Sequence, residues 1–268
     1  MNRIDKKFQE LKAARRKAFI LYLTAGDPDF KRSINIISHM ENKGVDILEL
    51  GVPFSDPLAD GPTIQKASSR SLKQNALMKS VFNMVEILRK RKNFKLPIVL
   101  FTYYNPVMNF GLKKFILRCS QLGVDGILIL DLPPEEAEEY KNLAAKKDIK
   151  TVFLVSPTSP AGRIKKIAEA STGFIYCVSR TGVTGARKKL NTETPKLVKQ
   201  IKRYSTLPVA VGFGISTPRQ IREVAAYADA AVVGSAAVKK IEENLRKRNL
   251  EEKVVRFVSK LAAGLKNK

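Results

Sequence analysis

The chain has 268 residues, 44% of them hydrophobic, and an α/β barrel of about 250 residues is one domain that such a chain can form. No apolar run reaches the roughly 20 residues of a membrane helix, and the charged segment Met1 to Phe8 lacks the apolar middle of a secretory signal. The formal net charge is +24. Lys and Arg are spread over predicted helix faces without a nucleic-acid-binding motif, so we expect no specific nucleic-acid partner, although a positive field would attract a phosphorylated substrate.

The histidine and cysteine content excludes several kinds of site. His39 is the only histidine, which makes a Ser-His-Asp triad improbable and nearly excludes a histidine metal site. Cys119 and Cys177 lie in apolar segments and form no Cys-x-x-Cys pair, which argues against a disulfide framework or a zinc cluster. We therefore expect a cytoplasmic enzyme without a metal, in which carboxylates carry the proton chemistry.

Short apolar runs rich in β-branched residues recur along the chain. Runs that are apolar throughout are typical of parallel strands buried on both faces. In chain order the expected strands are Phe19–Thr24, Ile47–Gly51, Ile98–Tyr103, Gly126–Leu130, Thr151–Val155, Phe174–Val178, Pro208–Val211 and Ala230–Val233.

Helical patterns lie between these runs. Thr217 and Pro218, for example, have the order of an N-cap and a first helical residue, and Gly123 has the position of a helix end. Eight strands alternating with helices predict a (β/α)₈ TIM barrel that is a single domain over residues 1–268. We expect an extra helix at Asn2 to Ala14 that plugs the barrel bottom, and a short extra helix after the eighth strand. An open, doubly wound sheet is the alternative, but it would normally have fewer strands.

The second strand carries a carboxylate in an apolar setting, at Glu49. A buried ion pair or a solvated edge residue would explain it without function. An unpaired carboxylate at the C-terminal end of a barrel strand is more often catalytic, because that end of the barrel carries the active site. Desolvation would raise its pKa from about 4.3 toward neutrality, which suits a group that gives and takes a proton.

The proline-rich loop after this strand, Val52 to Pro62, carries Asp56 and Asp60. Either aspartate alone could simply cap a turn. A stiff loop that returns a second carboxylate to the end of the strand instead predicts a site with two carboxylates of different burial and different pKa.

Two glycine-containing turns follow the last two strands. They are Gly212-Phe213-Gly214 and Gly234-Ser235, and the second opens a helix. Barrel phosphate sites are built from these two loops and the N-terminus of a short helix. Ordinary strand-end turns are the alternative, but the two positions together favour a phosphate site.

The segment Ser179 to Lys189, after the sixth strand, is polar, basic and punctuated by glycines. It is either a plain surface loop or a mobile lid, since lids combine glycine hinges with groups that complete a site.

Several of these segments resemble the tryptophan synthase alpha family. The stretch from Glu49 to Gln65, ELGVPFSDPLADGPTIQ, is similar to the family signature at almost every position. The resemblance runs in order from about Phe19 to Leu245. It includes TAGDP from Thr24, TYYNP from Thr102, YCVSRTGVTG from Tyr176, GFGI from Gly212, and Gly234-Ser235.

The resemblance implies retro-aldol cleavage of indole-3-glycerol phosphate to indole and glyceraldehyde 3-phosphate, a carbon–carbon lyase step in tryptophan biosynthesis. Glu49 matches the acid/base group acting on indole C3 and the glycerol hydroxyl, and Asp60 matches the carboxylate that holds the indole N–H. On the lid, Thr184 would reach Asp60 on closure. The other implied substrate-binding residues are Gly185, Gly214, Gly234 and Ser235 for phosphate, and Tyr22, Ile64, Leu100, Tyr176 and Phe213 for indole.

The resemblance also implies a beta subunit that holds pyridoxal phosphate and receives indole through a tunnel, in an alpha-beta-beta-alpha heterotetramer. Asp56, Tyr103 and Asn105 match the partner-facing side, and the alpha chain itself needs no cofactor. Two features depart from the family pattern: the strongly basic charge, and the lid segment Arg187-Lys188-Lys189, which is placed to alter closure or the interface.

Two other functions remain open from the residues. Another phosphate-binding barrel, an isomerase or an aldolase, is one; a Schiff-base aldolase would want a lysine at a strand end, and the eight predicted strands contain none. A non-catalytic subunit that regulates a beta partner is the other, and the presence of both Glu49 and Asp60 argues against it.

Overall fold

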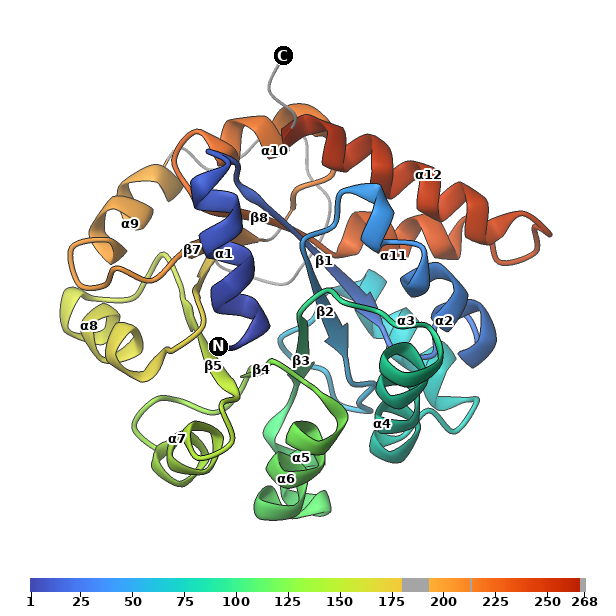
Figure 1. Ribbon diagram of the computed structural model, residues 1–268, viewed down its shortest axis with the longest axis horizontal. Coiled ribbons are helices and arrows are strands. Elements are labelled where there is room, and N and C mark those ends of the chain that lie inside the picture. The colour runs from blue at the N-terminus through green and yellow to red at the C-terminus, as the bar shows by residue number, and fades with distance from the viewer. Residues whose placement is uncertain (180–192, 213, 266–268) are drawn as a thin grey trace.

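The strands close into a parallel barrel, as expected. The computed structural model describes residues 1–179, 193–212 and 214–265. Each strand pairs with the next in chain order, and β8 pairs with β1 (Figure 1). All eight predicted strands are confirmed to within one residue at each end. They are β1 Ala18–Thr24, β2 Ile47–Gly51, β3 Ile98–Thr102, β4 Gly126–Ile129, β5 Lys150–Val155, β6 Ile175–Val178, β7 Val209–Gly212 and β8 Ala230–Val233.

Helices surround the barrel (Figure 1). They are α1 Arg3–Ala13, α2 Phe30–Ser38, α3 Pro62–Leu72, α4 Met78–Glu86, α5 Tyr104–Phe110, α6 Leu112–Leu122, α7 Glu138–Ala145, α8 Ala161–Ala170, α9 Thr194–Ile201, α10 Pro218–Ala225, α11 Ser235–Glu242 and α12 Leu250–Ala262. Three further short turns of helix are η1 Glu41–Lys43, η2 Ile87–Arg91 and η3 Ala263–Leu265. In the part of the chain that the structure describes, no helix combines the length and the apolar character needed to cross a membrane.

Local sequence signals place the ends of several helices. Thr217 caps α10 in a capping box, in which its side chain accepts from the backbone of Gln220 and the Gln220 side chain accepts from the backbone of Thr217. Gly123 ends α6 in the left-handed region at φ +76°, where a residue without a Cβ is favoured. Both helix ends depend on residues close together in the chain, so the sequence alone predicted them.

The alternation of side chains along each strand divides the core into two layers. In β3, Ile98 and Leu100 point outward into the layer between the strands and the helices, and Val99 and Phe101 point into the barrel. The register pairs Val99 with Glu49 of β2, so Glu49 also faces the barrel interior. An acidic side chain is therefore inserted into an otherwise apolar lumen.

Three aspartates fasten the strands together at the N-terminal end of the barrel. Asp46, Asp125 and Asp229 each precede an even-numbered strand and accept the backbone N–H of a residue at the start of the strand before it. The donors are the N–H groups of Phe19, Ile98 and Val209, at 2.9, 2.8 and 3.1 Å. Cationic side chains pair with these aspartates. At Asp125, for example, Arg3 and Arg89 contact one carboxylate oxygen each, at 2.9 and 2.7 Å.

Helix α1 covers this end of the barrel, in agreement with the predicted plug (Figure 1). Ile4 is fully buried in the apolar cluster of the barrel interior. Asn2 caps the helix by accepting from the N–H of Ile4, and its amide donates to the carbonyls of Asp125 and Asp148. The opposite end of the barrel is left open for a site.

Candidate active site

A pocket opens at the C-terminal ends of the strands, with about 430 Å³ of empty space including its mouth. Its walls come from segments far apart in the sequence. The lining residues are Tyr22, Glu49, Asp60, Ile64, Phe101, Tyr176, Gly214, Ile215, Val232, Gly234 and Ser235. None of these is a lysine, and Lys150, which the structure adds to the start of β5, pairs with Asp5 at 2.8 Å. The lysine at a strand end that a Schiff-base aldolase would want is therefore missing from the pocket lining.

Glu49 is fully buried within this pocket. Neither carboxylate oxygen has a hydrogen-bond partner among the described residues. Burial raises the pKa of Glu49 from its usual 4.5 to about 8, because the charged form loses the solvation of water and no cation replaces it. At neutral pH the group is mostly a neutral acid, able to donate a proton and take it back.

Asp60 is the second carboxylate of the pocket, and its environment is more polar. The hydroxyl of Tyr103 donates to Asp60 Oδ2 at 3.1 Å and accepts from the N–H of Ala59 at 3.0 Å. Gln65 fixes the same turn through its amide, which donates to the Asp60 carbonyl at 2.8 Å. Burial raises the pKa of Asp60 to about 6, and the hydrogen bond from Tyr103 opposes the rise. Asp60 is therefore mostly ionised at neutral pH, unlike Glu49.

Two tyrosines of the barrel each lie over the glycine that ends the next strand in the barrel. A Cβ on Gly51 would overlap the hydroxyl of Tyr22, and a Cβ on Gly212 would overlap the hydroxyl of Tyr176. Burial raises the pKa of both tyrosines well above the usual value, so both stay neutral. The glycines at the strand ends therefore make room for the aromatic walls of the pocket.

The turns after β7 and β8 meet at one side of the pocket, where Gly214, Gly234 and Ser235 line it. Gly214 has φ +84°, a conformation that side chains with a Cβ rarely adopt. Ser235 is the first residue of α11, so free backbone N–H groups and the positive end of the helix dipole lie at this side. The arrangement suits an oxyanion.

An ion cluster joins α3 to the loop after β1 and to α11. The guanidinium of Arg70 donates to both carboxylate oxygens of Asp27, at 2.7 and 2.9 Å, and lies 3.8 Å from Glu242 of α11. Asp27 is fully buried, so this bidentate pair is largely shielded from water. It ties together the helix that follows Asp60 and the helix that starts at Ser235.

The structure brings most of the predicted pocket residues together and separates one. Tyr22, Glu49, Asp60, Ile64, Tyr176, Gly214, Gly234 and Ser235 all line the pocket. The expectation for Leu100 is wrong, because Leu100 points outward and its neighbour Phe101 forms the wall instead. Thr184, Gly185, Phe213 and the basic segment 187–189 lie outside the described residues.

Two of the three residues expected at the partner surface are exposed, and the third is buried. Asp56 and Asn105 are exposed, but Tyr103 is only 5% exposed and its hydroxyl is engaged by Asp60 and Ala59, so its side chain offers little surface to a partner. Two large apolar residues that the sequence analysis did not single out, Leu58 and Met108, are 85% and 57% exposed on the same two segments.

The remaining candidates lie outside the site. His39 is exposed and is the C-cap of α2. Cys119 and Cys177 are buried free thiols. Among residues 1–179, 193–212 and 214–265, no cluster of three His, Cys, Asp or Glu side chains could hold a metal ion.

Comparison with known proteins decides the family. The family model described as tryptophan synthase alpha chain matches residues 8–267. The tryptophan synthase alpha chain of Opitutus terrae is 48% identical and that of Geotalea uraniireducens 46%, with 99% of this chain and 100% and 98% of the relatives covered. This chain belongs to the tryptophan synthase alpha family. As a member of this family, it cleaves indole-3-glycerol phosphate to indole and glyceraldehyde 3-phosphate in tryptophan biosynthesis.

Solved structures agree with the fold. A structure of Mycobacterium tuberculosis tryptophan synthase superposes with a TM-score of 0.91 at 34% identity, over 100% of this chain and 99% of that one. The alpha subunit of Legionella pneumophila superposes with a TM-score of 0.89 at 35% identity, over 99% and 98% of the two chains. The family is known to need no cofactor in the alpha chain, and its members work with a beta subunit.

Proposed function

We propose that Glu49 is the acid and base of the cleavage. The observation that carries this proposal is a fully buried carboxyl group with both oxygens unpartnered among the described residues and a pKa of about 8. Protonated Glu49 donates its proton to C3 of the indole ring. The resulting carboxylate then takes the proton of the glycerol hydroxyl beside the ring as the carbon–carbon bond breaks. Indole and the aldehyde leave, and Glu49 is protonated again.

Asp60 stabilises the charge that this step creates. Protonation at C3 places positive charge on the indole nitrogen, and an ionised carboxylate at the indole N–H lowers the energy of that state. The pKa of about 6 keeps Asp60 ionised at neutral pH, while the hydroxyl of Tyr103 holds its orientation. The two carboxylates therefore take different roles because their environments separate their pKa values.

The rest of the pocket binds the two ends of the substrate. Tyr22, Ile64, Phe101 and Tyr176 surround the indole ring with apolar surface. The phosphate lies against Gly214, Gly234 and Ser235, which offer backbone N–H groups and the start of α11. Gly185, Phe213 and Thr184 are expected to complete these two subsites.

The test is the single substitution Glu49→Gln, which keeps the shape and removes the proton. We expect indole release from indole-3-glycerol phosphate to fall by at least about 10²-fold, with folding intact by circular dichroism. Asp56→Asn is the matched control, since Asp56 is exposed, and it should keep the activity of the isolated chain. A folded Glu49→Gln protein with nearly unchanged turnover would contradict the assignment.

We also propose that the loop after β2 and helix α5 form the docking surface for a beta subunit that holds pyridoxal phosphate, in an alpha-beta-beta-alpha heterotetramer. Asp56, Asn105, Leu58 and Met108 are exposed on these two segments. Leu58→Glu should weaken binding of the beta subunit in titration calorimetry. Leu77→Glu, at a site that is 60% exposed on another loop, should not. Equal affinities of the two variants would contradict this docking surface.

Two broader expectations accompany the proposal. The cytoplasm is the expected location, because both cysteines are buried free thiols, as is usual for proteins of a reducing compartment. We also expect all of residues 1–268 to form the one barrel domain. Limited proteolysis that released a stable fragment smaller than the barrel would contradict the second expectation.

A further inference from the structure

The net charge of +24 plays no part in the site described above, and its distribution differs between the two ends of the barrel. The segments that lead into the strands are 14–17, 39–46, 87–97, 123–125, 146–149, 171–174, 202–208 and 226–229, and they contain thirteen Lys or Arg and five Asp or Glu. The described residues of the segments between each strand and the next helix contain eight Asp or Glu and no Lys or Arg. The sequence of 180–192 adds four Lys or Arg there.

Much of the negative charge at the N-terminal end is engaged inside the fold. Asp46, Asp125 and Asp229 are three of the five acids, and each accepts a strand N–H. Helix dipoles favour cations in the last turn of each helix, but they do not account for cations beyond the helix end, such as Arg15 and Arg203. The excess of positive charge is therefore a property of the surface.

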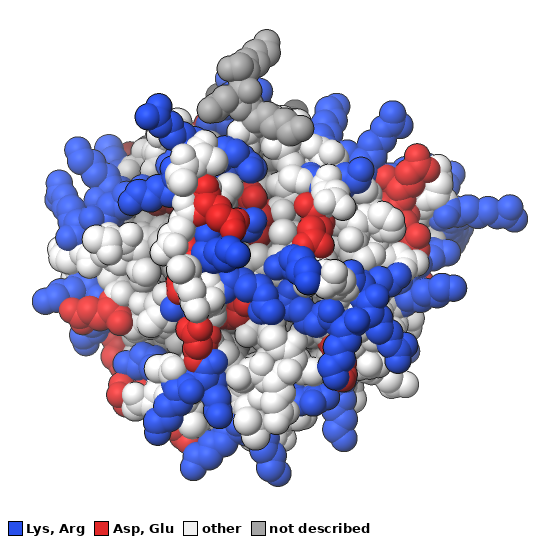
Figure 2. All heavy atoms as spheres, viewed as in Figure 1, with Lys and Arg blue, Asp and Glu red and all other residues white. Residues whose placement is uncertain are grey.

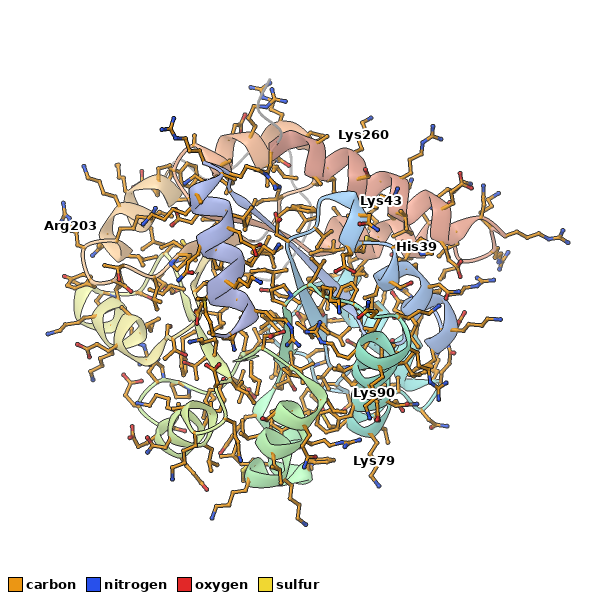
Figure 3. All side chains as sticks on the ribbon, viewed as in Figure 1. His39, Lys43, Lys79, Lys90, Arg203 and Lys260 are labelled. Carbon is orange, nitrogen blue, oxygen red and sulfur yellow. The ribbon has the colours of Figure 1, made fainter. Side chains whose placement is uncertain are left out.

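Figure 2 shows this end of the molecule, with Lys and Arg around the rim and across the centre right of the face. Lys12, Arg15 and Arg203 are exposed and have no ion-pair partner among the described residues. Arg203 extends outward from the rim (Figure 3). These charges are available to an external anion.

A groove with about 1500 Å³ of empty space, including its open mouth, lies on the same face, between α1 and the segment 202–208. Lys12 and Arg16 line one side of it, and Lys202 lines the other. The half-buried side chains of Phe8 and Leu207 give it apolar patches between these cations. The lining holds four Lys or Arg and two acids, and both acids are paired, Asp5 with Lys150, and Asp229 with Lys17 and Lys202, so positive charge remains in excess. Cationic sides with apolar surface between them suit a chain of phosphates that carries flat rings.

We propose that the N-terminal face of the barrel binds single-stranded nucleic acid without sequence preference, with the phosphate backbone along this groove. The cations neutralise phosphates, and the exposed ring of Tyr204, next to Arg203, offers a surface on which a base can stack. An anionic membrane fits the face less well. A membrane-binding face would expose several large hydrophobic side chains. Six are exposed in the described chain, and only two of them, Met1 before α1 and Tyr204 in the segment 202–208, lie beside the groove segments. The active site lies at the other end of the barrel, so both ligands can bind together.

The experiment is fluorescence anisotropy of a labelled 20-nucleotide polyuridine RNA with the full chain, between 50 and 300 mM KCl. We expect a Kd of about 10⁻⁴ to 10⁻⁶ M near physiological salt, weakening steeply as salt rises. The variant Lys12→Gln/Arg15→Gln/Arg203→Gln removes three cations from the face. If each contacts one phosphate, the slope of log K against log salt should fall by about 2.

The matched control is Lys73→Gln/Lys79→Gln/Lys113→Gln, which removes the same charge from exposed positions at the C-terminal end of α3 and in the first turns of α4 and α6. It should keep the slope of the wild type, and both variants should release indole at the wild-type rate. Equal losses of RNA affinity in the two variants would show diffuse attraction and overturn the proposal. No binding tighter than about 10⁻⁴ M at physiological salt would do the same. Binding to phosphatidylserine vesicles in place of RNA, lost in the first variant alone, would reassign the face to a membrane and overturn it as well.

Discussion

Asp125 and Glu49 are both buried carboxylates, one toward each end of the same barrel, and they differ in their partners. Asp125 contacts Arg3 and Arg89 and accepts the N–H of Ile98. Glu49 has no hydrogen-bond partner among the described residues, and burial raises its pKa to about 8. The paired group fastens strands, whereas the unpaired group holds a proton at neutral pH. The comparison teaches that the partners of a buried charge decide whether it stabilises the fold or is available for chemistry.

The largest expected effect is the contribution of the unpaired carboxyl group, Glu49, to the pH dependence of stability. The folded state keeps the Glu49 proton that the unfolded chain releases near pH 4.5, so the free energy of unfolding falls as pH rises from about 4.5 to about 8. The contribution over that window is roughly 5 kcal/mol at most. Glu49→Gln should lack it. Urea unfolding of both proteins at several pH values gives the difference, and parallel curves would contradict the pKa.

The next effect is the loss of stability when the ion pairs of Asp125 are broken. Asp125→Asn leaves Arg89, whose side chain is 10% exposed, with an uncompensated charge. We expect a loss of about 3–5 kcal/mol in the free energy of unfolding, with turnover per folded molecule unchanged. Glu223→Gln, which breaks the exposed pair of Glu223 with Arg219, should cost less than about 1 kcal/mol. If both changes cost the same in urea unfolding, the fastening role of Asp125 is wrong.

A smaller effect separates packing from chemistry at the site. Gly51→Ala places a Cβ on the hydroxyl of Tyr22, and overpacking of this kind costs about 1–3 kcal/mol. We expect a higher KM for indole-3-glycerol phosphate, because Tyr22 must move into the pocket. Adding Tyr22→Phe removes the overlapping oxygen and should restore part of the loss. Steady-state kinetics of the two single variants and the double variant measure this, and strictly additive effects would exclude the contact as the cause.

The smallest effect concerns the orientation of Asp60. Tyr103→Phe removes the hydrogen bond that lowers the pKa of Asp60, so that pKa should rise above about 6. The acidic limb of the kcat/KM profile should then move to higher pH by up to about one unit, since a hydrogen bond of this kind contributes about 1 kcal/mol. Tyr104→Phe, at the neighbouring position, should leave the limb in place. An unshifted limb in Tyr103→Phe would remove Tyr103 from this role.

The barrel and the acidic pair could be predicted from the sequence because both depend on local patterns. Continuous apolar runs gave all eight strands, and Glu49 was conspicuous within one of them. Glycines in the turns after β7 and β8 indicated the phosphate side of the pocket. These signals need only neighbouring residues to be read.

Registers and long-range partners could not be predicted in this way. An offset of one residue turns a strand side chain to the other face, and this is why Leu100 was expected where Phe101 lies. The contact of Tyr103 with Asp60 joins residues 43 positions apart, so neither segment alone indicated that the tyrosine is buried.

A direct measurement of the Glu49 pKa tests the central claim of this account. Difference infrared spectroscopy between the wild type and Glu49→Gln isolates the carbonyl stretch of the protonated Glu49 carboxyl group across a pH titration. The account predicts that this band persists at pH 7 and disappears with a midpoint of about 8. A midpoint near the ordinary value of about 4.3 would mean that Glu49 is ionised at neutral pH, and it would contradict the role proposed for it.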